Sequence, residues 1–244
     1  MKKNLLKLSV IVPCYNEEKR FKEGSAHFLS YLNKQKYKWE LIFVNDGSKD
    51  KTISLIKQLK KRNNNIKIVT YAKNHGKGYA IVQGVNKAKG QIIIFSDLDH
   101  SVSIDTIESF FKYFQKGFQI VIGSRRVKGA KFLKRQPPIR ELLGRGFTLL
   151  VRVLIDFKIK DATCGFKAFK LNIAKNSFNK IKIYDWAFDA EILFLCKKYN
   201  YKLAQAPVAW RDAKGTKVSI GKDILRSLGG LIKIRINDLQ KKYA

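Results

Sequence analysis

The chain has 244 residues, and 50 Lys and Arg against 19 Asp and Glu give it a formal net charge of +31. Because 45% of the residues are hydrophobic and 12% are aromatic, the chain has enough apolar surface for a full core, which excludes a disordered basic tail. The charge predicts an anionic partner, with nucleic acid, a membrane surface and phosphorylated small molecules as candidates. Lysine far outnumbers arginine, so a compositional bias without function also explains part of the charge.

The sequence gives no indication of a metal-binding cysteine cluster, an export signal or a membrane span. Cys14, Cys164 and Cys196 are scattered without a CxxC spacing, which predicts neither a zinc site nor a disulfide framework. The N-terminal apolar stretch is short and leads directly into a predicted core strand, unlike a signal peptide. No window reaches the roughly 18 uninterrupted apolar residues of a membrane span, and Arg152 interrupts the longest attempt. We therefore expect a soluble or peripheral protein.

The first half of the chain alternates between two kinds of segment. Four short runs rich in Ile and Val lack strict alternation, which predicts strands buried on both faces, at residues 8–12, 41–44, 66–71 and 92–95. Helical spacing between them predicts helices at residues 17–33, 51–61 and 78–89. A helix over 104–114 and a strand over 118–122 continue the series. This alternation predicts an α/β fold with a mainly parallel central sheet.

The second half begins with a basic block. Residues 125–145 carry eight Lys or Arg against one acid, Glu141. Helical spacing follows, with a polar face at Glu141, Arg145, Thr148 and Arg152 opposite an apolar face at Leu142, Leu143, Phe147, Leu150, Val153 and Leu154. We find no internal repeat and no linker, so we predict one domain spanning residues 1–244.

The chain is expected to end with a helix over 186–198, a strand over 203–210 and a basic amphipathic helix over 220–239. In the first of these helices, we assign the large apolar side chains to the core: Trp186, Phe188, Phe194 and Leu195. In the last helix, one apolar face is expected to carry Ile224, Leu225, Leu228, Leu231, Ile232 and Ile236. Gly229 and Gly230 weaken that helix prediction.

Polar residues follow three of the predicted strands at their carboxyl ends. They form the segments Pro13-Cys14-Tyr15-Asn16-Glu17-Glu18, Asn45-Asp46-Gly47-Ser48 and Ser96-Asp97-Leu98-Asp99. Taken singly, each segment is typical of a strand-to-helix turn with a capping side chain. Ligands of open parallel sheets bind outside the carboxyl ends of the strands, so the three segments together predict a binding site at that edge.

Asp97 and Asp99 are two residues apart at the end of a buried strand. In an extended chain, residues with this spacing point in the same direction. Two hard carboxylates in this position suit Mg²⁺ or Mn²⁺ bound together with substrate phosphates.

The segment Asn74-His75-Gly76-Lys77-Gly78 opens a predicted helix. Its glycines allow close approach of a ligand to the backbone, and Lys77 is a candidate phosphate contact at the helix N-terminus. Neither the GxxxxGK[ST] spacing of a P-loop nor a GxGxxG fingerprint is present, which removes the main support for those two nucleotide-binding classes. At the end of another predicted strand, Arg125 leads the basic block and is a second candidate phosphate contact.

Taken together, the segments SVIVPCYNEE, FVNDGSKDKT, NHGKGYA and FSDLD resemble the family 2 inverting glycosyltransferases of the GT-A fold. The later segments GSRR, IRELLGRGFTLLVR, DATCGFKAFK, WAFDAEIL and KGTKVS resemble the dolichyl-phosphate glucosyltransferases, in the order of that family. The resemblance extends from Leu8 to Leu239. It implies a single GT-A domain in which residues 1–124 bind a nucleotide sugar and residues 125–244 bind the acceptor.

The resemblance also implies roles for individual residues. The donor nucleotide would be bound by Pro13, Tyr15, Asn16, Glu17, Asp46, Gly47 and Ser48, with Lys77 near the base or the phosphates. Asp97 and Asp99 would form the DxD motif that holds Mg²⁺ or Mn²⁺ and the diphosphate. Facing the diphosphate or the acceptor phosphate would be Arg125, Arg140 and Lys217. The catalytic group would comprise Asp99, Asp161 in an acceptor-side loop at 161–167, and Asp189 at the position of a general base in related transferases.

The reaction implied is transfer of glucose from UDP-glucose to a polyprenyl or dolichyl phosphate. A phosphate monoester has a second pKa near 6, so the acceptor is largely a dianion at neutral pH and needs no strong base. Ser101 stands where mannosyl relatives carry a Gln, which favours the glucosyl version. Eukaryotic relatives also carry an N-terminal membrane helix that this sequence lacks. We therefore expect a cytoplasmic enzyme held peripherally on the cytoplasmic face of a membrane by its basic surface.

Several alternatives stay open. Within enzymes they are a GDP-mannose-dependent mannosyltransferase and a bacterial transferase that acts on a polysaccharide precursor. The charge alone suggests a nucleic-acid-binding protein, but aromatic residues do not interleave with the basic block, so we expect no nucleic-acid partner. The C-terminal helix suggests a non-catalytic membrane-surface module, although such a module has no use for Asp97 and Asp99. The sequence carries no signal for an oligomeric state.

Overall fold

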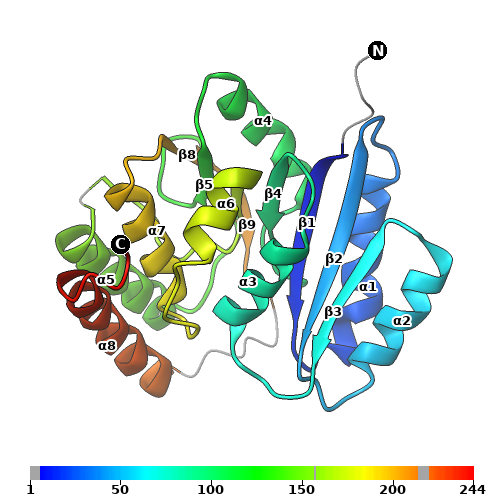
Figure 1. Cartoon of the computed structure of the whole chain (residues 1–244), viewed down its shortest axis with the longest axis horizontal. Helices are drawn as coiled ribbons and strands as arrows, with labels where there is room; N and C mark the ends of the chain where they lie inside the picture. Colours follow the sequence, from blue (N-terminus) through cyan, green and yellow to red (C-terminus); the bar gives the residue numbers. More distant parts are fainter. Residues whose placement is uncertain (1–5, 157, 214–219) are drawn as a thin grey trace.

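The structure is a computed structural model that describes residues 6–156, 158–213 and 220–244, with the side chains of the last helix described from Leu228 onward. A seven-stranded sheet crosses both halves of the chain in the order β3-β2-β1-β4-β7-β5-β8 (Figure 1). Its strands are β1 (Leu6–Cys14), β2 (Lys38–Asp46), β3 (Ile66–Tyr71), β4 (Ile92–Phe95), β5 (Ile120–Ser124), β7 (Lys167–Lys170) and β8 (Leu203–Pro207). Only β7 runs antiparallel to its neighbours β4 and β5; the other pairs of this sheet are parallel.

Helices cover both faces of the sheet. They are α1 (Glu18–Leu32), α2 (Thr52–Arg62), α3 (Lys77–Lys87), α4 (Ile107–Gln115), α5 (Pro138–Leu154), α6 (Leu171–Phe178), α7 (Phe188–Lys198) and α8 (Ile220–Leu239). The core is divided accordingly: Val10 and Phe43 pack with α1, α2 and α4, whereas Ile11 and Val44 pack with α3, α6 and α7. Both faces of the strands are therefore buried, which is why their sequences do not alternate.

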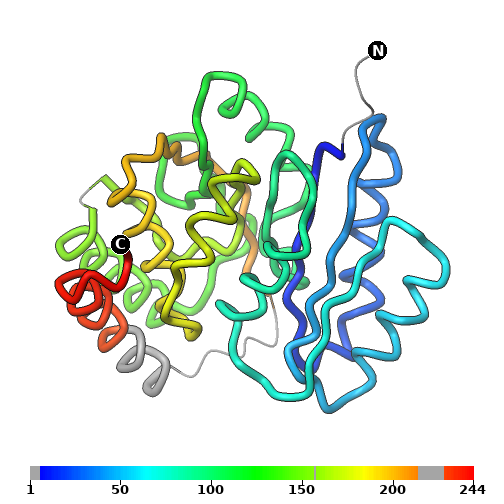
Figure 2. The backbone as a smooth tube through the Cα atoms, viewed as in Figure 1, coloured from blue at the N-terminus to red at the C-terminus, as the bar shows by residue number. Residues whose placement is uncertain are grey.

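The predicted elements of the first half are present with shifted ends, and the second half contains elements that the sequence analysis missed. The predicted helix over 104–114 is divided into a 3₁₀ turn, Ile104–Thr106, and α4. Similarly, the predicted strand over 203–210 divides into β8 and β9 (Ala209–Arg211), and β9 pairs with β6 (Lys131–Lys134) in a separate two-stranded sheet. The elements missed are β6, β7 and α6. Lysines at both ends of β6 and β7 prevent a continuous hydrophobic run in these strands. Of the two, β7 lies inside the seven-stranded sheet, between β4 and β5, and the path of the chain can be followed in Figure 2.

The helices α5 and α8 lie against each other at the end of the molecule far from β3 (Figure 1). The expected division of α5 into a polar and an apolar face is wrong: Thr148 is buried and donates to the Gly144 carbonyl at 2.9 Å. Apolar side chains of α5 are exposed instead, including Leu142, Leu150 and Val153. A hydroxyl bonded within its own helix is buried at low cost, so Thr148 fills the inward position.

The single apolar face expected for α8 is also wrong. Its inward side carries Leu231 and Ile234, whereas Ile232 and Ile236 are exposed. In the helix before it, Phe188, Phe194 and Leu195 are buried as expected, but Trp186 lies at the surface ahead of α7. Within the described part of the chain, no helix is both long enough and apolar enough to cross a bilayer.

Candidate active site

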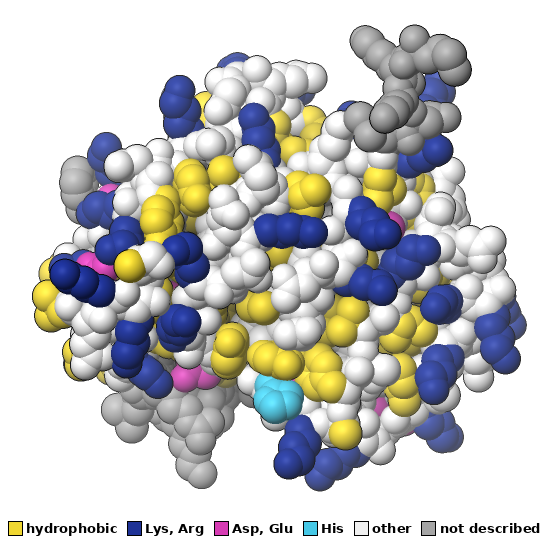
Figure 3. Space-filling view, viewed as in Figure 1, with side chains coloured by type: hydrophobic (Ala, Val, Ile, Leu, Met, Phe, Trp, Pro, Cys, Tyr) yellow, Lys and Arg dark blue, Asp and Glu magenta, His cyan; other side chains and the backbone are white. Residues whose placement is uncertain are grey.

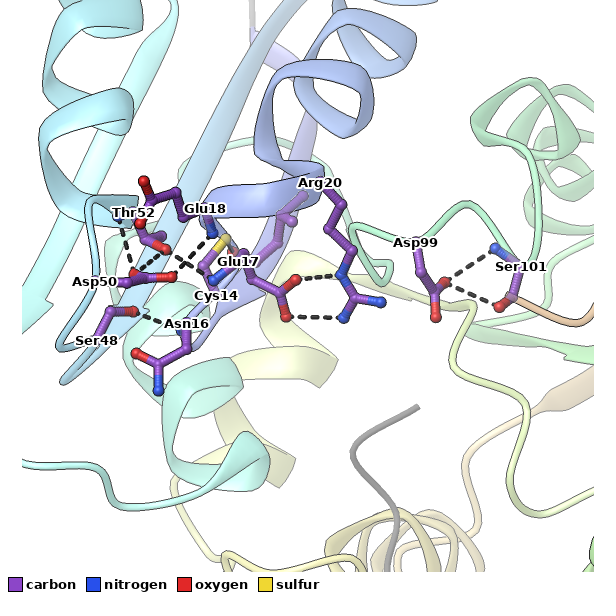
Figure 4. Close-up of polar contacts among 11 residues, drawn as sticks. Cys14, Asn16, Glu17, Glu18, Arg20, Ser48, Asp50, Thr52, Asp99 and Ser101 are labelled. Carbon is purple, nitrogen blue, oxygen red and sulfur yellow. Dashed lines mark hydrogen bonds and ion pairs between the residues drawn. The ribbon is translucent and has the colours of Figure 1, made fainter. Parts of the chain in front are cut away.

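The loops after β1 and β2 are joined by hydrogen bonds at the carboxyl edge of the sheet, the lower edge in Figure 1. The Asn16 N–H donates to Ser48 Oγ at 3.0 Å, and the Glu17 N–H donates to Thr52 Oγ1 at 2.8 Å (Figure 4). In the opposite direction, the Lys49 N–H donates to Asn16 Oδ1 at 2.8 Å. Asn16 has a left-handed φ of 50°, a conformation that Asn tolerates better than most residues. The expected nucleotide-binding segments are thus brought together, with Pro13 and Tyr15 half-buried beside them.

Asp46, at the end of β2, holds the loop that precedes α3. Its buried carboxylate accepts from the N–H groups of His75 at 2.9 Å and Gly76 at 3.0 Å, and from Asn74 Nδ2 at 2.8 Å. Gly47 has a φ of +66°, and a Cβ there would collide with the backbone of the same loop at Lys73 and Asn74. Asp46 and Gly47 therefore shape the loop that presents Lys77.

Lys77, the first residue of α3, makes an ion pair with Asp97: its Nζ lies 2.6 Å from Oδ1. Burial acts to lower the pKa of Lys77. The negative charge of Asp97, and to a lesser extent that of Asp189, outweighs this effect, so the pKa lies above its usual value. A Cβ on Gly165 would collide with Oδ2 of Asp97 and would lie 3.5 Å from Lys77 Nζ. The acceptor-side loop thus packs directly on the DxD motif and leaves Lys77 charged beside it.

Arg20 of α1 connects the first loop to the DxD motif and was not anticipated from the sequence. Its Nη2 donates to Glu17 Oε1 at 2.8 Å and its Nε to Oε2, so the guanidinium lies between Glu17 and Asp99 (Figure 4). The hydrogen bonds to Glu17 raise the pKa of Arg20, and Asp99 and Asp97 raise it further. Asp99 Oδ1 itself accepts from Ser101 N at 3.0 Å and Ser101 Oγ at 2.9 Å. The i,i+3 spacing of Glu17 and Arg20 was the available signal, but their approach to Asp99 depends on the tertiary fold.

The two carboxylates of the DxD motif fit a hard divalent cation. Asp97 and Asp99 are half-exposed at the edge of the sheet, and carboxylate oxygens are ligands that Mg²⁺ and Mn²⁺ favour. Within the described residues no group of three His, Cys, Asp or Glu side chains is placed to hold a metal. The motif thus suits a cation that takes its other ligands from water and a diphosphate, the usual habit of Mg²⁺.

Arg125 and Asp161 form an ion pair with each other. Asp161 is fully buried and accepts from the N–H, Nε and Nη2 of Arg125 at 2.9, 2.8 and 2.8 Å, and Nη2 also donates to Thr163 Oγ1 at 2.7 Å. Burial acts to raise the pKa of Asp161, but the Arg125 charge overcomes it and the pKa falls below its usual range. This pair fixes the acceptor-side loop to the end of β5.

Asp189, at the start of α7, is also engaged by a cation. Lys167 is fully buried, and its Nζ donates to the Cys164 carbonyl at 2.6 Å and to Oδ1 of Asp189. Lys167 is a second site residue that was not anticipated from the sequence, because a single Lys in a short segment gives no pattern that predicts its burial.

Two further predicted contacts have different outcomes. Arg140 makes an ion pair with Asp212, its Nη1 lying 3.1 Å from Oδ1. Lys217 lies outside the described residues.

Comparison with known proteins identifies the family of the chain. Residues 9–178 match the family described as Glycosyl transferase family 2. The dolichyl-phosphate beta-glucosyltransferase ALG5D of Trichomonas vaginalis is 33% identical over 96% of this chain and 72% of its own length. The dolichyl-phosphate beta-glucosyltransferase of Homo sapiens is 32% identical over 89% of this chain and 74% of its own length, and that of Saccharomyces cerevisiae is 29% identical over 94% and 74%.

Solved structures share the fold. Glucosyl-3-phosphoglycerate synthase from Mycobacterium tuberculosis, in complex with Mn²⁺, UDP-glucose and phosphoglyceric acid, superposes with a TM-score of 0.68 at 18% identity, covering 94% of this chain and 79% of that one. The same protein with Mg²⁺ and UDP gives a TM-score of 0.69. The expected GT-A fold is confirmed, and the match to the family and to the relatives defines a glycosyltransferase. The chain belongs to glycosyl transferase family 2.

Proposed function

We propose that the protein transfers glucose from UDP-glucose to a polyprenyl phosphate such as dolichyl phosphate, with inversion at the anomeric carbon. The observation that carries this proposal is the meeting of Lys77, Asp97, Asp99 and Arg20 at one edge of the sheet. The names of the relatives support the glucose and the dolichyl phosphate, and the UDP-glucose bound by the structural neighbour supports the donor. In this proposal, residues 1–124 bind the donor and residues 125–244 bind the acceptor.

The donor diphosphate is placed at Lys77 and the DxD motif. Lys77 is held charged beside Asp97, so its ammonium group is positioned to contact a phosphate oxygen as the leaving group gains charge. Arg20 keeps Glu17 oriented at the entrance and adds positive charge near Asp99. When bound at Asp97 and Asp99, Mg²⁺ or Mn²⁺ supplies neutralisation of the diphosphate charge.

The acceptor phosphate is itself the nucleophile. One of its oxygens forms a bond to the anomeric carbon as the bond from that carbon to the diphosphate oxygen breaks, and UDP leaves with the electron pair. The dianion needs no base to deprotonate it. Asp189 and Asp161 therefore act as positioning residues: Asp189 holds Lys167, and Asp161 holds Arg125, on either side of the loop that packs on Asp97.

A surface of α5, β6 and α8 is proposed to bind the membrane that contains the acceptor. Most of the exposed large apolar side chains of the described chain belong to these elements: Phe132, Leu133, Ile139, Leu142, Leu149, Leu150, Val153, Leu154, Ile232, Ile236 and Leu239. We call this set the apolar end. Exposed cations on the same helices include Arg145, Arg152, Lys233 and Arg235. An apolar face bordered by cations suits an anionic bilayer surface, and in this proposal it holds the enzyme peripherally on the leaflet that contains the lipid phosphate.

On the face shown in Figure 3, Lys and Arg side chains are spread across the surface and are not gathered into one stripe. A nucleic-acid groove is instead expected to have a continuous basic stripe. On this face, the distribution gives no support to a nucleic-acid groove.

A transfer assay tests the proposal. The purified chain is incubated with Mn²⁺, dolichyl phosphate in detergent and either radiolabelled UDP-glucose or radiolabelled GDP-mannose, and label in the organic phase is measured. We expect transfer from UDP-glucose, loss on chelation with EDTA, and loss in Asp99→Asn. Transfer from GDP-mannose alone would overturn the assignment of the donor, and transfer from neither would overturn the reaction.

A further inference from the structure

The two glycines that flank Lys77 lie against the segment that precedes α7. A Cβ on Gly76 would lie 2.7 Å from the carbonyl oxygen of Tyr184. A Cβ on Gly78 would lie 2.9 Å from Tyr184 Cα and 2.8 Å from Phe188 Cβ. Side chains in proteins do not come this close, so the two backbones are in direct contact on both sides of Lys77. Part of the close approach that these glycines permit is thus made by the chain itself.

The same segment binds a backbone donor of α3. The Gly78 N–H donates to the Tyr184 carbonyl at 3.0 Å. An N–H group in the first turn of a helix has no partner within the helix, so a partner from elsewhere fixes that turn in place. The hydrogen bond therefore attaches the start of α3, and with it the backbone of Lys77, to Tyr184.

We call residues 184–187 the bridging segment; it lies between α6 and α7 (Figure 1). Its turn is held from within, because the Ala187 N–H donates to Asp185 Oδ1 at 2.9 Å. On the outside, the Tyr184 ring packs edge-on against the Tyr79 ring of α3, with 5.3 Å between the ring centroids. The segment is thus joined to α3 through a side chain as well as through its backbone.

The other side of the bridging segment lies against α8. Gly230 of α8 is buried, and a Cβ there would lie 2.3 Å from Ala187 Cβ. Its next neighbours, Ala187 Cα and Asp185 Oδ1, would be 3.8 and 4.0 Å away, so the Ala187 methyl alone would collide. The preceding residue, Gly229, is exposed, and a Cβ there would meet nothing within 4 Å. The backbone of α8 therefore packs on the segment at Gly230.

Hydrogen bonds make a second connection between α8 and the chain that leads into this segment. The buried carboxylate of Glu191 accepts from Lys182 N at 3.1 Å and from Ile183 N at 2.9 Å. The Tyr243 hydroxyl donates to the same carboxylate and accepts from Asn237 Nδ2 of α8 at 3.3 Å. Packing and hydrogen bonds thus both tie the position of the segment to that of α8.

We propose that the bridging segment positions Lys77 for the donor diphosphate, and that α8 sets the place of the segment. Asp97 holds the ammonium group of Lys77, and the segment holds its backbone. Tyr184 and Ala187 are therefore positioning residues that act through Lys77. This inference rests on the proposed function for the role of Lys77 and adds to it the residues that fix Lys77 in place. Since part of α8 belongs to the apolar end, the helix proposed to meet the membrane also supports the donor site.

Three variants test the link from α8 to Lys77. Gly230→Ala pushes α8 away from Ala187, whereas Gly229→Ala adds the same methyl to the same helix without a collision. The double variant Gly230→Ala/Ala187→Gly removes the methyl that the new Cβ would meet. Amide exchange at Gly78 is followed by NMR without ligand, because it reports opening of the hydrogen bond to Tyr184. Affinity for UDP with Mn²⁺ is measured by calorimetry.

In Gly230→Ala we expect faster exchange at Gly78 and affinity for UDP that is weaker by about tenfold. Gly229→Ala should behave as the wild type does, and the double variant should return toward it. In the transfer assay, the KM for UDP-glucose should rise in Gly230→Ala while the KM for dolichyl phosphate stays unchanged, a split that a general loss of structure does not produce. Unchanged exchange and affinity in Gly230→Ala, equal losses in Gly229→Ala, or no recovery in the double variant would each overturn the inference.

Tyr184→Ala and Tyr184→Phe give a second comparison, which stays informative if Gly230→Ala does not fold. The Tyr184 side chain is exposed, and only Tyr184→Phe keeps the ring that packs on Tyr79. Affinity for UDP is expected to be weaker in Tyr184→Ala than in Tyr184→Phe by about threefold. Equal affinities would contradict a positioning role of Tyr184.

Two outcomes separate this inference from the proposed function. Faster exchange at Gly78 with unchanged affinity for UDP would overturn the role of Lys77 at the donor diphosphate, although the packing of α8 on the segment would stand. Coupled losses of Gly78 protection and UDP affinity, in a chain that transfers no sugar to dolichyl phosphate, would refute the proposed function and leave the positioning of Lys77 intact.

Discussion

At the scale of single residues, the centre of the site is the carboxylate of Asp97, which is held from two sides. Lys77 contacts one oxygen, and the backbone at Gly165 packs against the other. Gly165 belongs to the acceptor-side loop, which Lys167 fixes through the Cys164 carbonyl. The position of a residue that we propose to bind the donor thus depends on a loop from the half that we propose to bind the acceptor.

Gly165→Ala is expected to impair the site by displacing Asp97, because the added Cβ collides with Oδ2. A displacement on the scale of 1 Å lowers rates by about 10²-fold. We expect kcat/KM for transfer to fall accordingly and Mn²⁺-dependent affinity for UDP to weaken. Gly146→Ala is the control for UDP binding, since nothing lies within 4 Å of the Cβ it adds. Wild-type UDP affinity in Gly165→Ala would show that residue 165 does not confine Asp97.

Asp161→Asn is expected to destabilise the protein by about 3–5 kcal/mol at neutral pH, because it leaves the buried Arg125 guanidinium unpaired. The folded pKa of Asp161 is depressed, so its contribution is present above the unfolded pKa near 4 and is lost as the pH falls through the folded pKa.

Urea unfolding of the wild type and Asp161→Asn from pH 7 to pH 3 checks this. The difference in unfolding free energy should be constant near neutrality and shrink below about pH 4. The exposed Asp105→Asn should change stability by no more than about 0.5 kcal/mol. A difference between wild type and Asp161→Asn that persists unchanged at pH 3 would contradict the assignment.

Residues of the site that follow a strand were predictable, and their partners were not. Lys77, Asp97 and Asp99 were expected at the carboxyl edge because parallel strands end there together. Arg125 and Asp161 were expected to face substrate, yet they pair across 36 positions of the chain. The contacts of Arg20 with the DxD motif and of Lys167 with Asp189 could not be predicted, because the choice of partner for a buried charge is decided by tertiary packing.

At the scale of elements, α8 is held by the residues that follow it. Tyr243 is fully buried, and its hydroxyl donates to the buried Glu191 of α7 and accepts from Asn237 Nδ2 at 3.3 Å. Glu191 also accepts from Lys182 N and Ile183 N at 3.1 and 2.9 Å. Tyr243 therefore joins α8, through Asn237, to α7, through Glu191.

Tyr243→Phe is expected to cost about 1–3 kcal/mol, because it removes the hydroxyl donor to a buried carboxylate. Tyr243→Ala also leaves a cavity and is expected to cost about 3–5 kcal/mol. For a chain of this length, each kcal/mol lowers the melting temperature by about 2–4 °C. Lys242→Ala changes an exposed neighbour and should melt as the wild type does. Equal melting temperatures for all three variants would show that Tyr243 does not hold α8.

Elements with a continuous apolar run were predicted within a few residues, whereas short elements with lysine at their ends were not. Strand β7 is buried, but its sequence KAFK gives no strand signal. The inward and outward faces of α5 were reversed in part, because Thr148 satisfies its hydroxyl within the helix and occupies the buried position. A pattern of polar and apolar residues cannot report such local hydrogen bonding.

At the scale of the whole molecule, the apolar end is expected to decide membrane binding. The double variant Leu142→Gln/Val153→Gln removes two exposed apolar side chains, each worth up to about 1.5–3 kcal/mol when fully buried. We expect at least about tenfold weaker binding to vesicles that contain phosphatidylserine.

Vesicle flotation at low and high salt measures this binding. Added NaCl and neutral lipid should each weaken the wild type, because Lys and Arg contribute through screened charge. Tyr184→Gln removes an exposed aromatic side chain that packs on Tyr79 of α3, outside the apolar end, and should bind as the wild type does. Binding indifferent to both salt and anionic lipid would contradict an electrostatic contribution.

The antiparallel strand β7 also has a consequence for how the chain folds. It lies between β4 and β5, so the two parallel parts of the sheet pair only through a strand that is made later than either of these two neighbours. Until β7 has left the ribosome, the edges of β4 and β5 carry unpaired backbone groups, which are templates for pairing with other chains. Pairing between strands that are far apart in the sequence is slow, because the chain between them loses conformational entropy before the new contacts form. Nascent chains that end before residue 167 are therefore expected to aggregate, and completion of β7 is the step that joins the two halves into one sheet.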